Sequence, residues 1–161
     1  MTKKALIIID VQNYFVNELT KFIPKKIVKH ISKADYDYLV FTKFVNKKGS
    51  NFFRLLNWKT MVSGQETEIH NSLIMFVEKN NVFTKNSYSI FKAKDLDNFL
   101  NKKNIRELFL CGMDTEACVL ASAFEAFDLG YQVKIIKELC FSHSGKSLHN
   151  SALKIINQCI G

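Results

Sequence analysis

The stretch LFLCGMDTEACVLASAFEAF, residues 108–127, decides the fold of this chain. It begins with an apolar run that is typical of a buried strand and ends with an alanine-rich segment that favours a helix. A turn lies between the two, and Cys118 stands at the far end of that turn. A cysteine in this position is either a small core residue or a nucleophile at the start of a helix.

The same change from strand to helix recurs along the whole sequence. The expected strands cover residues 4–10, 37–45, 81–85, 107–112 and 131–138, and the expected helices cover residues 24–32, 95–104, 116–130 and 145–160. Residues 46–63 have no clean period and are expected to form an irregular loop. This alternation predicts an α/β fold of three layers, α/β/α, around a mostly parallel, Rossmann-like sheet. Because no repeat or linker interrupts the pattern, residues 1–161 are expected to form a single domain.

Charge and cysteine content argue against several classes of protein. The chain carries 23 Lys and Arg against 15 Asp and Glu, a net charge of +8, but its lysines are scattered. We therefore expect solvated charged faces and no nucleic-acid partner. The four cysteines form no CxxC pair and are too few for a disulfide framework, which favours a reducing, cytoplasmic location. The apolar run at residues 5–9 is too short to cross a membrane, so no membrane partner is expected.

Three reactive side chains follow strands that the parallel sheet would align. Asp10 ends the first strand, Lys85 ends the third, and Cys118 follows the fourth. In open parallel sheets, ligands bind at the carboxyl ends of the strands. Asp10 could accept the thiol proton and Lys85 could lower the pKa of the thiol, while backbone N–H groups of Asp114 and Cys118 could stabilise an oxyanion. Taken singly, the three have plainer interpretations: a core cysteine, a capping aspartate and a solvated lysine.

Four segments resemble the isochorismatase-like cysteine hydrolases, a group that contains nicotinamidases, N-carbamoylsarcosine amidases and isochorismatases. They are ALIIIDVQNYF (5–15), KNSYSIF (85–91), LCGMDTEACVLASAFEAFDLGYQVKIIKELCFS (110–142) and, more weakly, SLHNSALKII (147–156). The resemblance implies that Asp10 is the catalytic acid and base, that Lys85 is its partner and that Cys118 is the nucleophile. It also implies a cis peptide bond between Met113 and Asp114 that turns the Asp114 N–H toward the oxyanion.

The resemblance extends to the substrate pocket, with two departures. Gln12, Phe15 and Tyr88 match motif positions and are expected at the pocket, with Phe52, Phe53 and Trp58 of the loop near it. The Asp-x-His metal motif that nicotinamidases carry after the second strand is absent from FTKFVNKKGS (41–50), so we expect no metal, no cofactor and an activity other than nicotinamidase. Position 114 more often holds a small or aromatic residue. The resemblance further implies a homo-oligomer.

The sequence therefore predicts a cysteine-dependent hydrolase that cleaves a C–N bond of a small-molecule amide through a thioester. A vinyl-ether hydrolase of the isochorismatase type, which could dispense with Cys118, is one alternative. A catalytically inactive binding subunit of the same fold is another. A flavodoxin-like nucleotide binder is disfavoured because DVQNYFVNE (10–18) has no glycine to cradle a phosphate.

Overall fold

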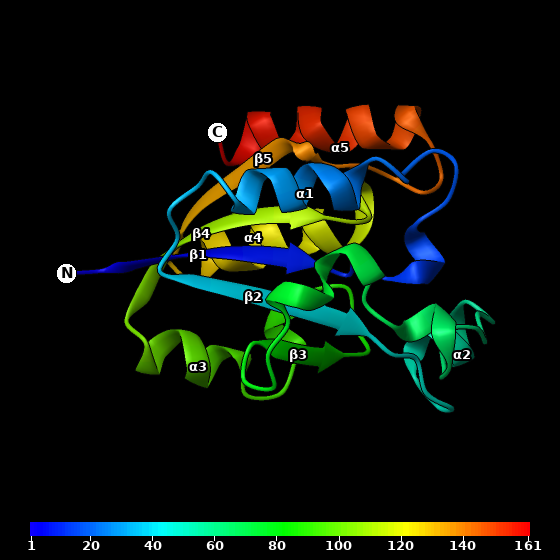
Figure 1. Cartoon of the computed structure of the whole chain (residues 1–161). Helices are drawn as coiled ribbons and strands as arrows, with labels where there is room; N and C mark the ends of the chain where they lie inside the picture. Colours follow the sequence, from blue (N-terminus) through cyan, green and yellow to red (C-terminus); the bar gives the residue numbers. More distant parts are fainter.

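The computed structural model describes residues 1–161, and at its centre lies a five-stranded parallel sheet in the order β3-β2-β1-β4-β5 (Figure 1). The strands are β1 (Lys3–Ile9), β2 (Tyr38–Phe44), β3 (Val82–Lys85), β4 (Ile105–Gly112) and β5 (Gln132–Cys140). With helices on both faces, this sheet confirms the predicted α/β architecture.

The helices cover the two faces of the sheet as the strand order requires. They are α1 (Ile23–Ile31), α2 (Asn51–Leu55), α3 (Leu96–Lys102), α4 (Leu120–Asp128) and α5 (Lys146–Cys159). The chain moves from β1 through β2 to β3 toward one edge of the sheet, and then from β3 to β4 and β5 toward the other edge. Because crossovers between parallel strands are right-handed, the segments that connect the first three strands cover one face and the segments that connect the later strands cover the other. In Figure 1, α1 lies in front of the sheet, α4 lies behind it and α5 runs along the β5 edge. None of these helices combines the length and apolar character that a bilayer crossing needs.

Strand β1 is apolar throughout because it lies at the centre of the sheet, between β2 and β4. Its residues Ala5–Ile9 are almost completely buried and belong to one continuous hydrophobic core. Ile9 pairs with Thr42 on one side and with Gly112 on the other, so β1 and β4 end level with one another and β2 extends two residues further, to Phe44. A parallel strand covered on both faces has this continuous apolar pattern.

Gly112 brings the turn that follows β4 close to the end of β1. Its φ is 118°, a conformation that L side chains rarely adopt, and an added Cβ would lie 2.1 Å from the Ile9 carbonyl oxygen. Only glycine fits this close approach of two backbones. The residue therefore fixes the starting point of the segment that carries Cys118.

Two segments differ from the sequence-based expectation. The predicted irregular loop 46–63 contains helix α2, whose N-cap Ser50 Oγ accepts a hydrogen bond from the Phe53 N–H at 3.2 Å. A five-residue helix is too short to show a helical period in the sequence. The predicted helix 116–130 is divided into a π-helical turn, Thr115–Val119, and α4. Local widening of a helix to π geometry is common at functional sites and has no sequence period of its own.

Candidate active site

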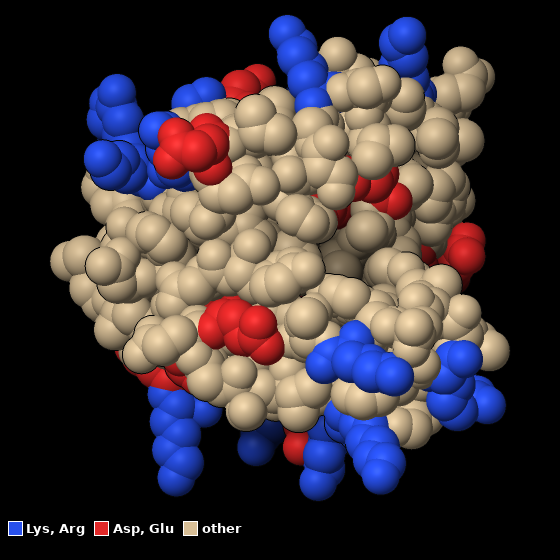
Figure 2. All heavy atoms as spheres, turned by 90° about the vertical axis from the view of Figure 1, so that its right-hand side faces the viewer, with Lys and Arg blue, Asp and Glu red and all other residues tan.

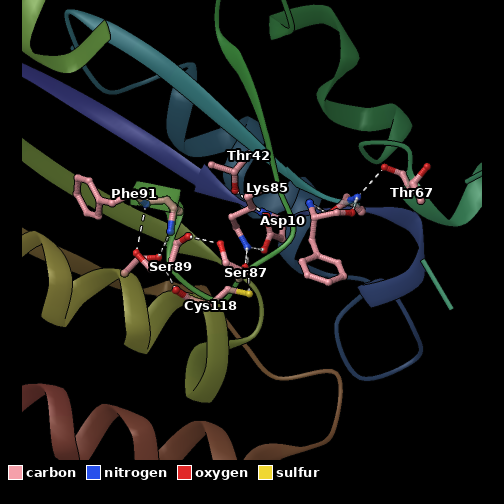
Figure 3. A network of polar contacts seen from close by, with 12 residues as sticks. Asp10, Thr42, Thr67, Lys85, Ser87, Ser89, Phe91 and Cys118 are labelled. Carbon is pink, nitrogen blue, oxygen red and sulfur yellow. Dashed lines mark hydrogen bonds and ion pairs between the residues drawn. The ribbon is translucent and has the colours of Figure 1, made fainter. Parts of the chain in front are cut away.

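Asp10, Lys85 and Cys118 come together at the carboxyl edge of the sheet, from the ends of β1 and β3 and from the turn after β4 (Figure 3). Lys85 Nζ lies 2.6 Å from Asp10 Oδ2 and 3.3 Å from Cys118 Sγ. The side chains of Asp10 and Lys85 are completely buried, and Cys118 is 7% exposed. The three residues that sequence reasoning placed at strand ends thus form one hydrogen-bonded group below the surface.

Asp10 and Lys85 are held in place by further hydrogen bonds. Asp10 Oδ1 accepts from Thr42 Oγ1 at 2.7 Å, and the Asp10 N–H donates to the same hydroxyl at 3.3 Å. Lys85 Nζ also donates to the Ser87 carbonyl at 2.8 Å (Figure 3). An ammonium group has three N–H donors, and here the carboxylate, the carbonyl and the sulfur receive all of them. The side chains are therefore oriented before any ligand binds.

The protonation states of this group follow from burial and charge. Burial acts to lower the pKa of Lys85, but the neighbouring Asp10 and Cys118 outweigh it and raise that pKa, so the ammonium stays charged. Burial raises the pKa of the Cys118 thiol well above its usual value and the charge of Asp10 adds to this, whereas Lys85 acts in the opposite direction. Lys85 therefore acts to lower the pKa of the thiol, but burial outweighs this effect. These directions favour a charged ammonium at Lys85 beside a protonated thiol at Cys118.

The turn before Cys118 is ordered by contacts to the segments around it. The peptide bond between Met113 and Asp114 is cis, and the Asp114 N–H donates no hydrogen bond within the chain. Thr115 anchors the turn, because its N–H donates to the Phe141 carbonyl at 3.3 Å and its hydroxyl pairs with His149 Nδ1 at 2.8 Å. His149 therefore holds the turn from α5 without reaching the three-residue group.

A cavity of about 240 Å³ opens above Cys118. Figure 2 faces the right-hand side of Figure 1, where the strands end, and shows a hollow bordered mainly by uncharged residues, with lysines and arginines projecting at the margins. Most of the walls are aromatic. The lining residues are Tyr14, Phe15, Phe44, Phe52, Leu56, Trp58, Tyr88, Asp114, Ala117, Cys118 and His143.

Two of the three residues predicted to line the pocket do so, and the third does not. Phe15 and Tyr88 are part of the wall, as are Phe52 and Trp58 from the loop after β2, whereas Phe53 is not. Gln12 is completely buried away from the cavity.

The amide of Gln12 joins three backbone segments instead of facing a ligand. Its Nε2 donates to the carbonyls of Phe44 and Thr67 at 2.9 and 2.6 Å, and its Oε1 accepts from the Phe44 N–H at 2.8 Å. These contacts tie the segment after β1 to the end of β2 and to the loop beyond it. Sequence position alone could not separate this role from ligand binding, because both use a buried amide.

The structure explains the unusual aspartate at position 114. Its carboxylate accepts a hydrogen bond from the His143 N–H at 2.8 Å and pairs with the His143 ring at Nδ1. Sequence reasoning did not assign His143 to the site, because it lies after β5, far along the chain from position 114. The signal available was the atypical Asp114 itself, since a buried carboxylate needs a partner.

The residues after β2 do not fit the metal site of nicotinamidases. At this place the chain has Asn46, whose Nδ2 donates to the carbonyls of Trp58 and Thr60 at 2.9 and 3.1 Å and whose Oδ1 accepts from Ser50 Oγ at 2.7 Å. Asn46 thus holds the loop that supplies the aromatic wall. Nowhere do three or more His, Cys, Asp or Glu side chains gather as metal ligands would.

Comparison with known proteins agrees with the fold and with the family resemblance. The family model described as the isochorismatase domain matches residues 4–161. The isochorismatase family protein PncA of Bacillus subtilis is 28% identical over 99% of this chain and 97% of its own. The solved structure of nicotinamidase PncA from Bacillus subtilis superimposes with a TM-score of 0.82 at 28% identity, covering 99% of this chain and 97% of that one.

A further solved structure shares the fold alone. The isochorismatase-like hydrolase from Alkaliphilus metalliredigens has a TM-score of 0.84 at 22% identity and covers 98% of this chain and 92% of its own. Since the family model spans nearly the whole sequence, the chain belongs to the isochorismatase family of hydrolases.

Proposed function

We propose that this hydrolase cleaves the C–N bond of a small-molecule amide through a thioester on Cys118. The observation that carries the proposal is the position of Lys85 Nζ, 2.6 Å from Asp10 Oδ2 and 3.3 Å from Cys118 Sγ, at the floor of an aromatic cavity. A nucleophile, a base and a group that orients both are the parts that covalent acyl transfer requires.

Attack begins with the transfer of the thiol proton to Asp10. The raised pKa of Cys118 favours the thiol in the free enzyme, so we assign formation of the thiolate to the arrival of the substrate carbonyl. Asp10 takes the proton, and the sulfur electron pair forms the C–S bond. Lys85 remains charged and offsets the negative charge as it passes between carboxylate and sulfur.

The carbonyl oxygen becomes an oxyanion beside the turn that carries Cys118. The Asp114 N–H, which has no acceptor within the chain, is available to donate to it, and we assign the Cys118 N–H as the second donor. When the tetrahedral intermediate collapses, the C–N bond breaks and Asp10 returns its proton to the leaving nitrogen. An amine or ammonia departs and the acyl group stays on sulfur.

Hydrolysis of the thioester uses the same groups in reverse order. Asp10 removes a proton from water, the hydroxide attacks the thioester carbonyl, and the C–S bond breaks. The thiolate regains its proton from Asp10, and the carboxylic acid product leaves. No cofactor takes part in these steps.

The cavity supports a compact, planar substrate. Its volume of about 240 Å³ lies below the roughly 300–1,000 Å³ of pockets for drug-sized ligands. Aromatic walls such as Phe15, Trp58 and Tyr88 favour stacking with a flat acyl group. The similarity to a nicotinamidase supports amides as the substrate class, while the residues after β2 support an acyl group other than nicotinoyl.

The proposal is tested with a panel of small aromatic and aliphatic amides, ureides and isochorismate. We expect an amide to be hydrolysed by the native protein and by Cys159→Ala, which removes an exposed cysteine, but not by Cys118→Ala. Intact-protein mass spectrometry after rapid acid quenching should show the acyl mass on Cys118. Full turnover by Cys118→Ala would refute the thioester, and if isochorismate were then the substrate, the vinyl-ether alternative would replace it.

A further inference from the structure

Asp114 and His143 form a second ionisable pair at the cavity, separate from the group around Lys85. The Asp114 side chain is 7% exposed and comes from the turn after β4, whereas His143 is 31% exposed and comes from the loop after β5. Two contacts join them: the His143 N–H donates to Asp114 Oδ1, and ring Nδ1 pairs with Asp114 Oδ2. The mechanism proposed above uses the Asp114 N–H but leaves both side chains without a role.

Neighbouring side chains hold the His143 ring in place, and its Nε2 atom has no hydrogen-bond partner within the chain. Phe15 and Tyr14 contact it with ring centroids 5.4 and 5.9 Å away, and the His143 carbonyl accepts from Asn17 Nδ2 at 2.9 Å. Ring Nδ1 is engaged by Asp114, while Nε2 makes no hydrogen bond within the chain. His143 is also the only lining residue that can carry a positive charge. Its position is therefore fixed and its free nitrogen is available to a ligand.

The surroundings of His143 favour its protonated form. Its hydrogen bond to Asp114 raises the pKa of the imidazole; partial burial opposes this, and the charges of Asp114 and Glu116 add to it. Glu116 lies behind the pair, where its Oε1 accepts from Ser142 Oγ at 2.6 Å. The other titratable groups of the cavity wall are Tyr14, Tyr88 and Cys118. With Nδ1 paired to a carboxylate, Nε2 is a donor whenever the ring is protonated, and the raised pKa extends the pH range over which the ring is protonated.

We propose that His143, oriented by Asp114, binds a second oxygen acceptor of the substrate, one that is distinct from the carbonyl under attack. The inference rests on the proposed amide hydrolysis and narrows its substrates to small planar amides with a carboxylate or carboxamide oxygen away from the scissile bond. In a cavity with mainly aromatic walls, a single charged donor determines how a flat molecule is oriented. His143 is then a specificity residue and Asp114 is its positioning residue.

Binding is measured in the Cys118→Ala protein, so that the result does not depend on turnover. The probes are benzamide, 3-carboxybenzamide and isophthalamide, which share one ring and differ in the second acceptor. We expect the two acceptor-bearing amides to bind about 10- to 100-fold more tightly than benzamide by calorimetry, as a hydrogen bond from a charged donor provides. If 3-carboxybenzamide binds more tightly than benzamide but isophthalamide does not, the second group must be charged as well as an acceptor. If both bind more tightly by the same factor, an uncharged oxygen acceptor suffices.

Two variants in the Cys118→Ala background identify the donor. His143→Phe keeps a ring against Phe15 and Tyr14 but lacks the N–H. It should reduce the affinity ratio between the acceptor-bearing amides and benzamide to about one. His143→Gln retains a neutral donor and should recover part of the preference. Asp114→Asn, which keeps an acceptor for the His143 N–H, should weaken the preference progressively as the pH rises above the ordinary histidine value.

Nuclear magnetic resonance gives a readout that a purely structural role would not produce. The His143 C–H resonances should shift, and the pKa of the ring should rise, when 3-carboxybenzamide binds but not when benzamide binds. Equal affinities for all three probes, or a preference that survives His143→Phe, would overturn the inference. Because Cys118→Ala carries no chemistry, these outcomes are independent of whether the native protein hydrolyses amides.

Discussion

Asp10→Asn should make Cys118 more reactive toward alkylating agents while abolishing hydrolysis. The charge of Asp10 raises the pKa of the thiol and Lys85 lowers it, so removing the carboxylate charge leaves Lys85 as the dominant neighbour. The thiolate is then the remaining anionic partner for a buried ammonium 3.3 Å away. Each unit by which the thiol pKa falls raises the thiolate fraction about tenfold at neutral pH. Hydrolysis loses its acid and base, which typically contributes about 100- to 10,000-fold.

The same substitution carries a cost in stability. Removing one partner of a buried ion pair commonly destabilises a protein by about 3–5 kcal/mol, and both side chains of the Asp10–Lys85 pair are fully buried. Lys85→Met, which removes the other charge, should destabilise the fold in the same range but slow alkylation, because the thiol loses its only cationic neighbour. Asp10→Asn combined with Lys85→Met removes both charges and should be more stable than Asp10→Asn alone.

The assay follows iodoacetamide labelling of Cys118 by peptide mass spectrometry between pH 6 and 9, with urea unfolding of each variant. Exposed Cys159 provides an internal reference in the same sample. The expected order of labelling at Cys118 is Asp10→Asn, then native, then Lys85→Met. Slower or unchanged labelling in Asp10→Asn would refute the opposing influences assigned to the two neighbours.

Other predictions concern backbone fit, a buried amide and pH. Gly112→Ala should destabilise the fold by about 3 kcal/mol or more, because its Cβ would meet the Ile9 carbonyl, whereas Gly49→Ala, also at positive φ but with open space around it, should cost about 1 kcal/mol in urea unfolding. Gln12→Leu should lower the free energy of unfolding by about 3 kcal/mol, because it leaves buried backbone groups without hydrogen-bond partners. The folded protein should keep the native KM, and a rise in KM without loss of stability would show that Gln12 contacts the substrate. Burial raises the pKa of the Cys140 thiol to about 12, so the thiol loses its proton at lower pH in the unfolded chain than in the folded one. The free energy of unfolding should therefore fall as the pH rises above 9, by up to about 1.4 kcal/mol per pH unit for each such thiol. Cys140→Ala should reduce that slope in urea titrations between pH 9 and 10, and an unchanged slope would contradict the assignment.

The sheet could be predicted because each strand carries a local signal. Ala5–Ile9 is apolar in every position, and the strands β1 to β5 begin and end within two residues of the expected bounds. The positions of Asp10 and Lys85 could be predicted because the carboxyl ends of parallel strands lie at the same edge of the sheet, where ligands bind. Helix α2 escaped prediction because its five residues are far fewer than the window of about 11 residues over which a helical period can be recognised. Oligomeric state and cytoplasmic location stay predictions.

The amino-acid sequence by itself determined the parallel sheet, because hydrophobic periodicity is a local property, and it led us to expect Asp10, Lys85 and Cys118 at one edge of that sheet. Only the tertiary structure decided what Gln12, Asp114 and His143 do. A buried amide or carboxylate takes its role from the atoms that surround it, and those atoms come from segments far apart in the chain. The same holds for the protonated thiol of Cys118, since burial, a property of the whole fold, outweighs the lysine beside it.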